Sequence, residues 1–375
     1  MIYFDNAATT FPKPEAVYQA LDFANRNLSF NAGRGAYPKA KEGVSILDDL
    51  RHEIASFAKA DYRNVTLLSS ATESLNLIIL GLNLTKSSVV YVSPFEHNAI
   101  IRPLHCLQKS IGFRIEVLPF DKKTWKPDTD RINDLFALSK PTAVFISQIS
   151  NVTGLIIEYE GIFESARKYG AINILDASQG YGVVPVNVVG VDFLVFAGHK
   201  SLYGPFGIAG FINFSDNELK IVKSGGNGSD TLNPDMPDNH HERYESGSPN
   251  VPAAYGLLTS IKWIKTKDLF SREKELTDYA ISKLKEISKI NLFVPENTDK
   301  LFGIISFSMD GYKADEIGQI LSGEYEIMIR TGYHCSPLVH DFINSKYYGG
   351  TARISLSYFN TKEDIDCLVE ALKSF

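Results

Sequence analysis

The sequence predicts an α/β protein in which helices cover a mainly parallel sheet, followed by a smaller α+β unit. Between about residues 89 and 214, short β-branched runs alternate with helical patterns, as is typical of parallel strands joined by crossover helices. A long helical region that begins near Pro252 then separates this block from a different pattern of elements. The length of 375 residues suits two or three domains of ordinary size.

The individual elements follow from hydrophobic periodicity. In the first block we expect strands at 89–92, 114–118, 142–147, 172–175, 193–196 and 208–212, the last a candidate for antiparallel pairing. Helices are expected at 15–26, 45–58, 98–110, 131–139 and 161–169, and a loop at the glycine- and asparagine-rich stretch 224–239. The helical region 252–285 is expected to break near 267–270. The C-terminal unit should contain strands at 303–308, 326–329 and 351–356 and helices at 314–321 and 362–373.

Composition argues against several classes of function. Apolar residues make up 44% of the chain, and the net charge is -6 without a basic run. Nucleic acid and anionic membranes are therefore not expected as partners. The longest apolar stretch, 75–84, is short and interrupted by polar residues, and the chain opens without a signal peptide. A cytoplasmic protein with a small-molecule substrate is expected.

The three cysteines differ in their surroundings. Cys106, Cys335 and Cys367 form neither a disulfide framework nor a paired metal-ligand spacing, so no metal site is expected. Cys106 and Cys367 lie in apolar helical patterns and are expected to be small core residues. Cys335 lies between Gly332 and Pro337, which predict a loop. Cys335 is therefore the cysteine expected to take part in chemistry.

Candidate site residues follow the predicted strand ends. Lys200, in Gly198-His199-Lys200, comes just after strand 193–196, and Asp176 comes just after strand 172–175. In an open parallel sheet these ends meet at one edge, so the lysine and the aspartate should share a crevice. Pyridoxal 5'-phosphate (PLP) chemistry needs that pair, because the amine holds the aldehyde as a Schiff base and a carboxylate keeps the pyridine nitrogen protonated. Alone, a lysine after a strand is more often a solvated end-cap.

Two helix starts add further candidates. The run 69–74 precedes a helix whose free amides and dipole would hold a phosphate, although a serine or threonine followed by an acid is also an ordinary helix cap. His97 follows the strand at 89–92, where an imidazole could stack on a planar ring or have a structural role. No Gly-x-Gly-x-x-Gly follows an early strand, which argues against a nucleotide-binding Rossmann protein.

Together the motifs resemble the class V aminotransferase-like family of fold-type I PLP enzymes, and within it the cysteine desulfurases and selenocysteine lyases. The resemblance rests on Phe4-Asp5-Asn6-Ala7-Ala8-Thr9-Thr10, Ala71-Thr72-Glu73, Glu96-His97-Asn98-Ala99, Asn151-Val152-Thr153-Gly154, Asp176-Ala177-Ser178-Gln179, Gly198-His199-Lys200, the run 243–250, the run 330–335 and Arg353-Ile354-Ser355-Leu356. It implies a mainly parallel seven-stranded sheet in a large PLP-binding domain, 15–251. Segment 1–14 would pack with the small domain, and 252–375 would form a connecting helix and the small C-terminal domain that carries Cys335.

The resemblance also implies roles for the candidate residues. Lys200 would form the internal aldimine, Asp176 would pair with the pyridine nitrogen, and Gln179 would bond the phenolic oxygen of the ring. His97 would stack on the ring and assist proton transfer. Further cofactor contacts would come from Ala71, Thr72, Asn151 and His199, and from Ser248 of a second subunit. A homodimer is therefore implied. Ala197 departs from the desulfurase pattern, which often has a phosphate-binding hydroxyl residue at that position.

Substrate and activity are implied by the last two motifs. Arg353 would bind the α-carboxylate of L-cysteine by two parallel hydrogen bonds, assisted by Arg330 and Asn151, unless it forms a surface ion pair. The Cys335 thiolate would take the sulfur as a persulfide, release L-alanine and pass the sulfur to an acceptor, by resemblance a dedicated protein. The alternatives are a selenocysteine lyase or C–S lyase of the same fold, and a non-catalytic class V scaffold protein.

Overall fold

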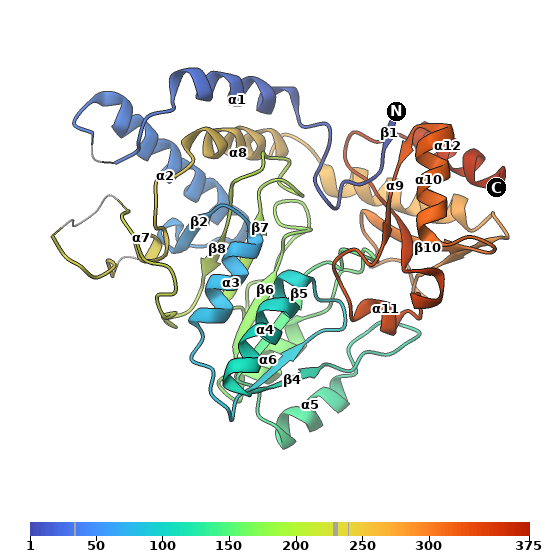
Figure 1. Cartoon of the computed structure of the whole chain (residues 1–375), viewed down its shortest axis with the longest axis horizontal. Coiled ribbons are helices and arrows are strands. Elements are labelled where there is room, and N and C mark those ends of the chain that lie inside the picture. Colours follow the sequence, from blue (N-terminus) through green and yellow to red (C-terminus); the bar gives the residue numbers. More distant parts are fainter. Residues whose placement is uncertain (34, 228–231, 239) are drawn as a thin grey trace.

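In the computed structural model, which describes residues 1–33, 35–227, 232–238 and 240–375, a seven-stranded sheet forms the centre of the larger part of the molecule (Figure 1). The strand order is β2-β8-β7-β6-β5-β3-β4. The strands are β2 (Val65–Leu68), β3 (Val89–Val92), β4 (Arg114–Val117), β5 (Ala143–Ser147), β6 (Ile172–Asp176), β7 (Phe193–Ala197) and β8 (Ala209–Asn213). Only β8 runs against its neighbours. The predicted mainly parallel, seven-stranded sheet is confirmed.

Helices cover both faces of this sheet, which explains why its central strands are buried and mostly apolar. On one face, α3 (Ala71–Gly81) and α4 (Asn98–Ile111) pack on side chains such as Val90, Phe145 and Val195. The opposite face is covered by α2 (Pro38–Ala58), α5 (Thr129–Leu138), α6 (Glu160–Arg167) and α8 (Val251–Ile264). Helix α1 (Glu15–Asn27) packs on α8, and α7 (His240–Tyr244) contacts β2.

The C-terminal part is built on a four-stranded antiparallel sheet of order β12-β13-β10-β9. Its strands are β9 (Ile290–Leu292), β10 (Ile304–Met309), β12 (Arg330–Gly332) and β13 (Thr351–Ser355). Its helices are α9 (Leu269–Leu284), α10 (Ala314–Tyr325), α11 (Val339–Phe342) and α12 (Lys362–Lys373). Strand β1 (Ile2–Tyr3) pairs in parallel with β11 (Ile327–Met328), so both chain ends lie in this part (Figure 1).

Most predicted elements are confirmed, and the differences have local causes. The break in the long helical region falls between α8 and α9, where the Asp268 side chain accepts from Ser271 N and begins the second helix. Helix α2 begins at Pro38, earlier than predicted. Its first turns are rich in polar residues and therefore show no apolar periodicity from which a helix could be predicted. The sequence does not predict strand β2, since four buried residues before a helix are too few to show a periodicity of their own.

The prediction that Cys106 and Cys367 are core residues is wrong, because both are exposed. Helix α4 buries the face that contains Ile100, Ile101 and Leu104. Cys106 comes two residues after Leu104, a rotation of about 200° around the helix, which places it on the solvent side. Cys367 has the same relation to the buried Ile365 of α12. In both helices the cysteine lies two positions from a buried residue, and this offset places it on the exposed face rather than the buried one.

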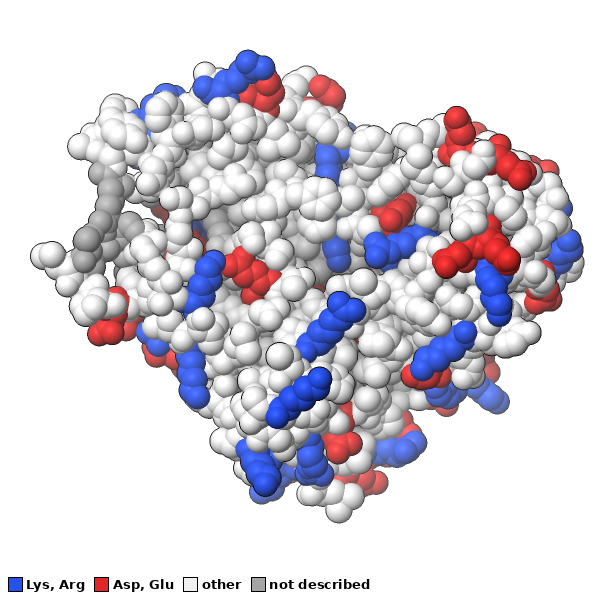
Figure 2. All heavy atoms as spheres, viewed as in Figure 1, with Lys and Arg blue, Asp and Glu red and all other residues white. Residues whose placement is uncertain are grey.

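The surface carries charges of both signs. On the face shown in Figure 2, acidic and basic side chains are interspersed. In the described part of the chain, no helix combines the length and the apolar character needed to cross a bilayer.

Gly154 lies where the two parts of the molecule meet. Its backbone has a φ of +73°, in the left-handed region, and its carbonyl accepts from Phe302 N at 2.9 Å. A Cβ atom here would lie 2.3 Å from Ile304 O, on the first residue of β10. Only glycine fits both the conformation and the close approach.

We therefore predict that Gly154→Ala destabilises the protein by about 3 kcal/mol, the combined effect of left-handed strain and steric overlap with backbone. Denaturant unfolding of the purified variant would measure the loss. Gly161→Ala is the matched control, because Gly161 lies in α6 and an added Cβ would meet nothing within 4 Å. This control should unfold at the same denaturant concentration or a higher one. Equal stability of the two variants would contradict the junction role of Gly154.

Candidate active site

A cavity of about 240 Å³ opens at the carboxyl ends of β5, β6 and β7. It brings together nearly all the predicted site residues, namely Ala71, Thr72, His97, Asn151, Asp176, Gln179, His199, Lys200, Arg330, Cys335 and Arg353. These residues come from both parts of the molecule. Of the predicted set, Ser248 lies elsewhere.

Lys200 and Asp176 lie in this cavity as adjacent strand ends require. Gly198 follows the end of β7, two residues before Lys200; its N–H donates to Ile208 O, and a Cβ at this glycine would lie 2.4 Å from that oxygen. Asp176 ends β6 and accepts from Ser178 N at 3.0 Å and Ser178 Oγ at 2.5 Å. Burial lowers the pKa of Lys200, and this effect outweighs the opposing attraction of Asp176. The nearby Arg353 and Arg330 lower it further, so the amine is more readily neutral than an exposed lysine.

His97 enters the cavity from the start of α4. Its Nδ1 accepts from Ala99 N at 3.0 Å and thereby caps the helix. Burial lowers the pKa of His97 to about 3, so the ring is neutral and its proton is on Nε2. The preceding Glu96 is fully buried and accepts from Ser93 Oγ and from Ser147 N and Oγ. Glu96 thus fixes the start of α4 to the end of β5.

The candidate phosphate contacts line the same cavity. Ser70 caps α3 by accepting from Glu73 N at 3.1 Å, so the helix-cap interpretation is correct, yet Ala71 and Thr72 of the same turn also line the cavity. Burial lowers the pKa of His199 to about 3, and its Nδ1 is buried without a hydrogen-bond partner in the described residues. A neutral imidazole nitrogen in need of a partner beside a helix N-terminus suits a phosphate group.

Asn151 anchors the loop that carries Cys335. Its Nδ2 donates to His334 O at 2.8 Å, and its Oδ1 accepts from Ser336 Oγ at 2.6 Å, so it bonds the residues on either side of the cysteine. Asn98 N also donates to Cys335 O at 2.7 Å. His334 and Cys335 both have left-handed φ angles, of 46° and 58°. The loop is therefore held at its backbone while Cys335 is exposed at the cavity rim.

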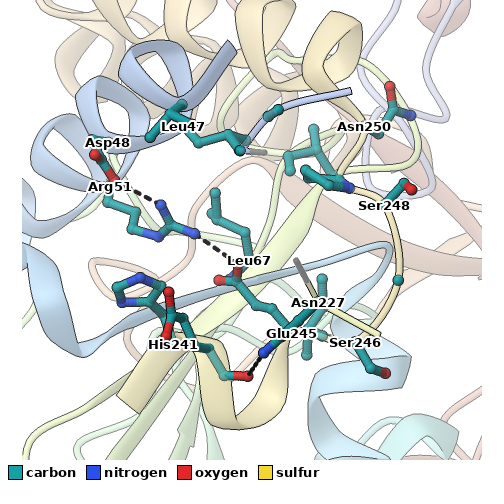
Figure 3. A pocket seen from close by; sticks show the side chains of 18 of the residues that line it. Leu47, Asp48, Arg51, Leu67, Asn227, His241, Glu245, Ser246, Ser248 and Asn250 are labelled. Carbon is teal, nitrogen blue, oxygen red and sulfur yellow. Dashed lines mark hydrogen bonds and ion pairs between the residues drawn. The ribbon is translucent and has the colours of Figure 1, made fainter. Parts of the chain in front are cut away.

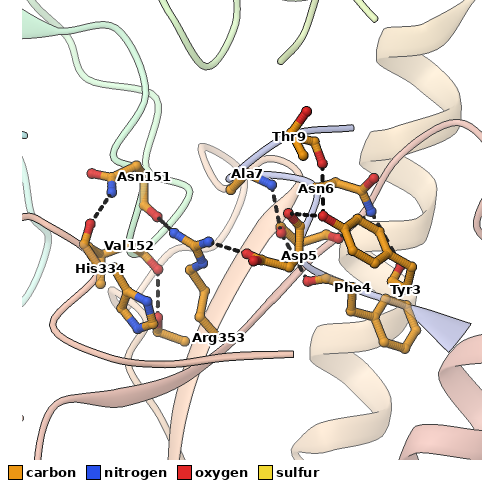
Figure 4. Close-up of polar contacts among 12 residues, drawn as sticks. Tyr3, Phe4, Asp5, Asn6, Ala7, Thr9, Asn151, Val152, His334 and Arg353 are labelled. Carbon is orange, nitrogen blue, oxygen red and sulfur yellow. Dashed lines mark hydrogen bonds and ion pairs between the residues drawn. The ribbon is translucent and has the colours of Figure 1, made fainter. Parts of the chain in front are cut away.

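The Arg353 side chain joins the N-terminal segment to the turn after β5 (Figure 4). It is 2% exposed, so the guanidinium is buried and its ion pair with Asp5 is not a pair of exposed surface groups. Its Nη1 donates to Asn151 O at 2.7 Å and its Nη2 to Asp5 Oδ1 at 2.6 Å. Arg330 lines the same cavity, and no ion pair of its guanidinium is found among the described residues. The two arginines make this end of the cavity suitable for a carboxylate.

The N-terminal segment forms one wall of the site, which the sequence analysis did not foresee. Gln179 Nε2 donates to Ala7 O at 2.9 Å. The carbonyl of His199, one peptide before Lys200, accepts from Thr9 Oγ1 at 3.0 Å and from Lys13 Nζ at 2.9 Å. These contacts join residues far apart in the sequence, so no local pattern could have predicted them. Ser178, by contrast, follows a strand end and could have been found there.

Ser248 is exposed and lines a second, larger cavity of about 950 Å³ (Figure 3). The wall of this cavity contains the buried Arg51, whose Nη2 donates to Glu245 Oε2 at 2.7 Å and whose Nη1 donates to Asp48 Oδ1 at 2.9 Å. Glu245 also accepts from Leu67 N, and burial raises its pKa to about 7. Within one chain, Ser248 therefore does not reach the cavity of Lys200.

Comparison with known proteins agrees with this geometry. The family model described as aminotransferase class-V matches residues 2–368. A cysteine desulfurase of Yersinia pseudotuberculosis is 30% identical, with 100% of this chain and 93% of the relative covered. A probable cysteine desulfurase of Pyrococcus abyssi is 29% identical, with 100% and 94% covered. The apo structure of a cysteine desulfurase from Thermococcus onnurineus has a TM-score of 0.89 at 27% identity, covering 100% of this chain and 94% of that one. The resemblance and the fold-type I architecture are thus confirmed, and the chain belongs to the aminotransferase class-V family.

Proposed function

We propose that the protein is a PLP-dependent cysteine desulfurase, which converts L-cysteine to L-alanine and transfers the sulfur to Cys335 as a persulfide. The observation that carries the proposal is the position of an exposed cysteine at the rim of the cavity that holds Lys200 and Asp176. A lysine and a carboxylate suit the cofactor, and a thiol beside them suits sulfur transfer.

The cofactor would be held by the residues already grouped around the cavity. Lys200 would bind its aldehyde, Asp176 would face the pyridine nitrogen, and Gln179 the phenolic oxygen. His97 would lie on the ring, with Thr72 and the unpartnered His199 Nδ1 at the phosphate. When bound, PLP supplies an electron-withdrawing ring that stabilises negative charge at the α-carbon of the substrate.

The residues of the chain would then bind the substrate and transfer protons. Arg330 and Arg353, with Asn151, would orient the α-carboxylate of the substrate. Lys200, whose pKa is lowered by burial, would take the α-proton as a neutral amine. Because the proton of the neutral His97 is on Nε2, His97 can donate a hydrogen bond into the cavity.

Cys335 would act on the sulfur. Its thiolate attacks the sulfur atom of the substrate, so an S–S bond forms while the C–S bond breaks, and the electron pair of that bond stays with the carbon skeleton. The skeleton is protonated and leaves as L-alanine. The persulfide then passes its outer sulfur to an acceptor thiol, for which a dedicated protein is the proposed partner.

The proposal includes a cytoplasmic homodimer. Ser248 is exposed and lines a different cavity from the Lys200 of its own chain, as expected for a residue that completes the phosphate site of a partner subunit. Such a contribution would make each site depend on both subunits, in keeping with the closed symmetry common among homo-oligomers.

The role of Lys200 can be tested by absorbance. The purified protein mixed with PLP should show the visible band of a lysine-bound cofactor, and Lys200→Ala should lose that band because its amine is gone. The control is Lys86→Ala, which removes an exposed lysine from a loop outside the site. A wild-type protein that remains colourless, or a Lys200→Ala variant with an unchanged band, would reject the cofactor proposal.

The role of Cys335 can be tested by mass spectrometry after incubation with L-cysteine. The peptide that contains Cys335 should gain one sulfur atom, and Cys335→Ala should form alanine from cysteine about 100-fold more slowly or worse, because the group that forms the covalent intermediate is missing. Cys106→Ala, which removes another exposed cysteine, should match the wild type. An unmodified Cys335 under turnover would reject the persulfide step.

The same variant separates the two neighbouring activities. If Cys335→Ala no longer desulfurates cysteine but still releases selenium from selenocysteine, the protein is a selenocysteine lyase. If both activities persist, Cys335 has no part in the mechanism. Absence of both activities in the wild type, without PLP uptake, would favour the scaffold protein.

The burial of His97 predicts a specific pH dependence of stability. An unfolded histidine takes up a proton near pH 6.5, whereas folded His97 resists it until about pH 3, so unfolding is favoured as the pH falls between these values. His97→Asn keeps an acceptor for the helix cap but cannot titrate. The fall in unfolding free energy over this range should be less steep, by up to about 1.4 kcal/mol per pH unit.

The measurement is denaturant unfolding at several values between pH 3 and pH 6.5. His52→Asn, at an exposed histidine of α2, is the control and should keep the slope of the wild type. His199 has the same direction of shift and remains in the variant, so only part of the slope should disappear. Identical slopes for His97→Asn and the wild type would show that folded His97 is not held neutral.

A further inference from the structure

Asp5 is bound to the arginine that the proposed function assigns to the substrate carboxylate. Its Oδ1 accepts from Arg353 Nη2 at 2.6 Å, and the two side chains are 22% and 2% exposed. The backbone dictates this contact. Asp5 forms a parallel bridge with Ser355 of β13. The side chain of Arg353, two residues before Ser355, lies on the same face of β13 as the side chain of Ser355. A carboxylate of the chain itself thus accepts a hydrogen bond from one nitrogen of the Arg353 guanidinium (Figure 4).

The bonding of Arg353 is incomplete in this arrangement. Its Nη1 donates to Asn151 O and its Nη2 to a single oxygen of Asp5, while its Nε is buried without an acceptor. A buried N–H without a partner is costly, and a carboxylate that meets Nε and Nη2 together would provide two parallel bonds. Asp5 supplies one of these two bonds. The unpartnered Nε therefore points to a carboxylate ligand that binds this edge more completely than Asp5 does.

We propose that Asp5 is a resident counter-ion, an internal carboxylate that pairs with Arg353 until the carboxylate of a substrate replaces it. This inference rests on the proposed function in that the substrate is an α-amino acid. While no substrate is bound, Asp5 compensates a buried cation that would otherwise be unpaired. When substrate arrives, the negative charge of Asp5 opposes the second anion, so the affinity for carboxylates is lower than the two arginines alone would give.

Displacement of Asp5 by a substrate carboxylate would also affect the surroundings of Lys200. The segment that carries Asp5 continues into Ala7, whose carbonyl accepts from Gln179, and into Thr9, whose hydroxyl donates to His199 O. Release of Asp5 would therefore loosen the wall of the cavity beside Lys200. A ligand without a carboxylate could not displace Asp5, and the N-terminal segment would stay in place.

The test uses propionate, which has a carboxylate but neither an amino group nor sulfur. Isothermal titration of the full purified chain should give a dissociation constant about tenfold lower for Asp5→Asn than for the wild type, because a neighbouring like charge commonly shifts an ionic equilibrium by about that factor. Glu15→Gln removes an exposed charge from the start of α1 and should leave the dissociation constant unchanged. The gain should disappear when Asp5→Asn is combined with Arg353→Lys.

Equal or weaker propionate binding by Asp5→Asn would overturn the proposal and make Asp5 a residue that merely positions Arg353. The outcome does not depend on turnover, so tighter binding by the variant in a protein that makes no alanine from cysteine would reject the desulfurase function and keep the counter-ion. If Asp5→Asn does not fold, hydrogen exchange of the wild type decides. Amides 5–10 should exchange faster with saturating propionate, and unchanged or slower exchange would overturn the proposal.

Discussion

The buried guanidinium of Arg353 is the interaction on which the arrangement of the site depends. Burial lowers the pKa of Arg353 because a charge in a poorly solvated place is costly, and the pairing with Asp5 offsets that cost. The partners of this one side chain come from the N-terminal segment and from the turn after β5, while Arg353 itself is on β13. Asn151, one of these partners, in turn bonds both neighbours of Cys335. The position of the loop that contains Cys335 is therefore linked, through Asn151, to a buried cation that has to be compensated.

The parallel sheet supplies the other half of the site. Because both of its faces are covered, its central strands are mostly apolar, and the polar residues at their carboxyl ends, such as Asp176, lie together at one largely buried edge. Low solvation there decides the protonation states. Burial is the largest influence on Lys200, and it outweighs the attraction of Asp176, so the pKa of the amine falls. The same cause keeps His97 neutral. A lysine amine that loses its proton more readily than usual, beside a neutral imidazole, is suited to accepting a proton in this cavity.

Sequence reasoning was reliable where a local pattern has one structural meaning. Strands buried on both faces, and polar residues just after them, led directly to Asp176 and Lys200. It failed where the outcome depends on phase or on distant partners. Cys106 was placed on the wrong side of α4 because a shift of two residues reverses the face of a helix. The pairing of Arg353 with Asp5 spans almost the whole chain, and the sequence carries no local signal for it. The same is true of the hydrogen bonds by which the Asn151 amide holds the loop around Cys335, while the contact of Asn151 with cofactor or substrate stays a prediction.

The geometry of that loop bears on how sulfur would leave the protein. Left-handed φ angles at two successive residues that are not glycine are unfavourable, and they persist only where the surroundings hold them. Here the bonds from Asn151 and Asn98 fix the carbonyls of His334 and Cys335, so the strained backbone keeps Cys335 at the rim rather than in the interior. A loop anchored on both sides of its cysteine cannot carry a persulfide far from the cavity. Under the proposed function, the acceptor thiol therefore has to approach Cys335 at the surface, which requires a partner whose reactive group is itself exposed.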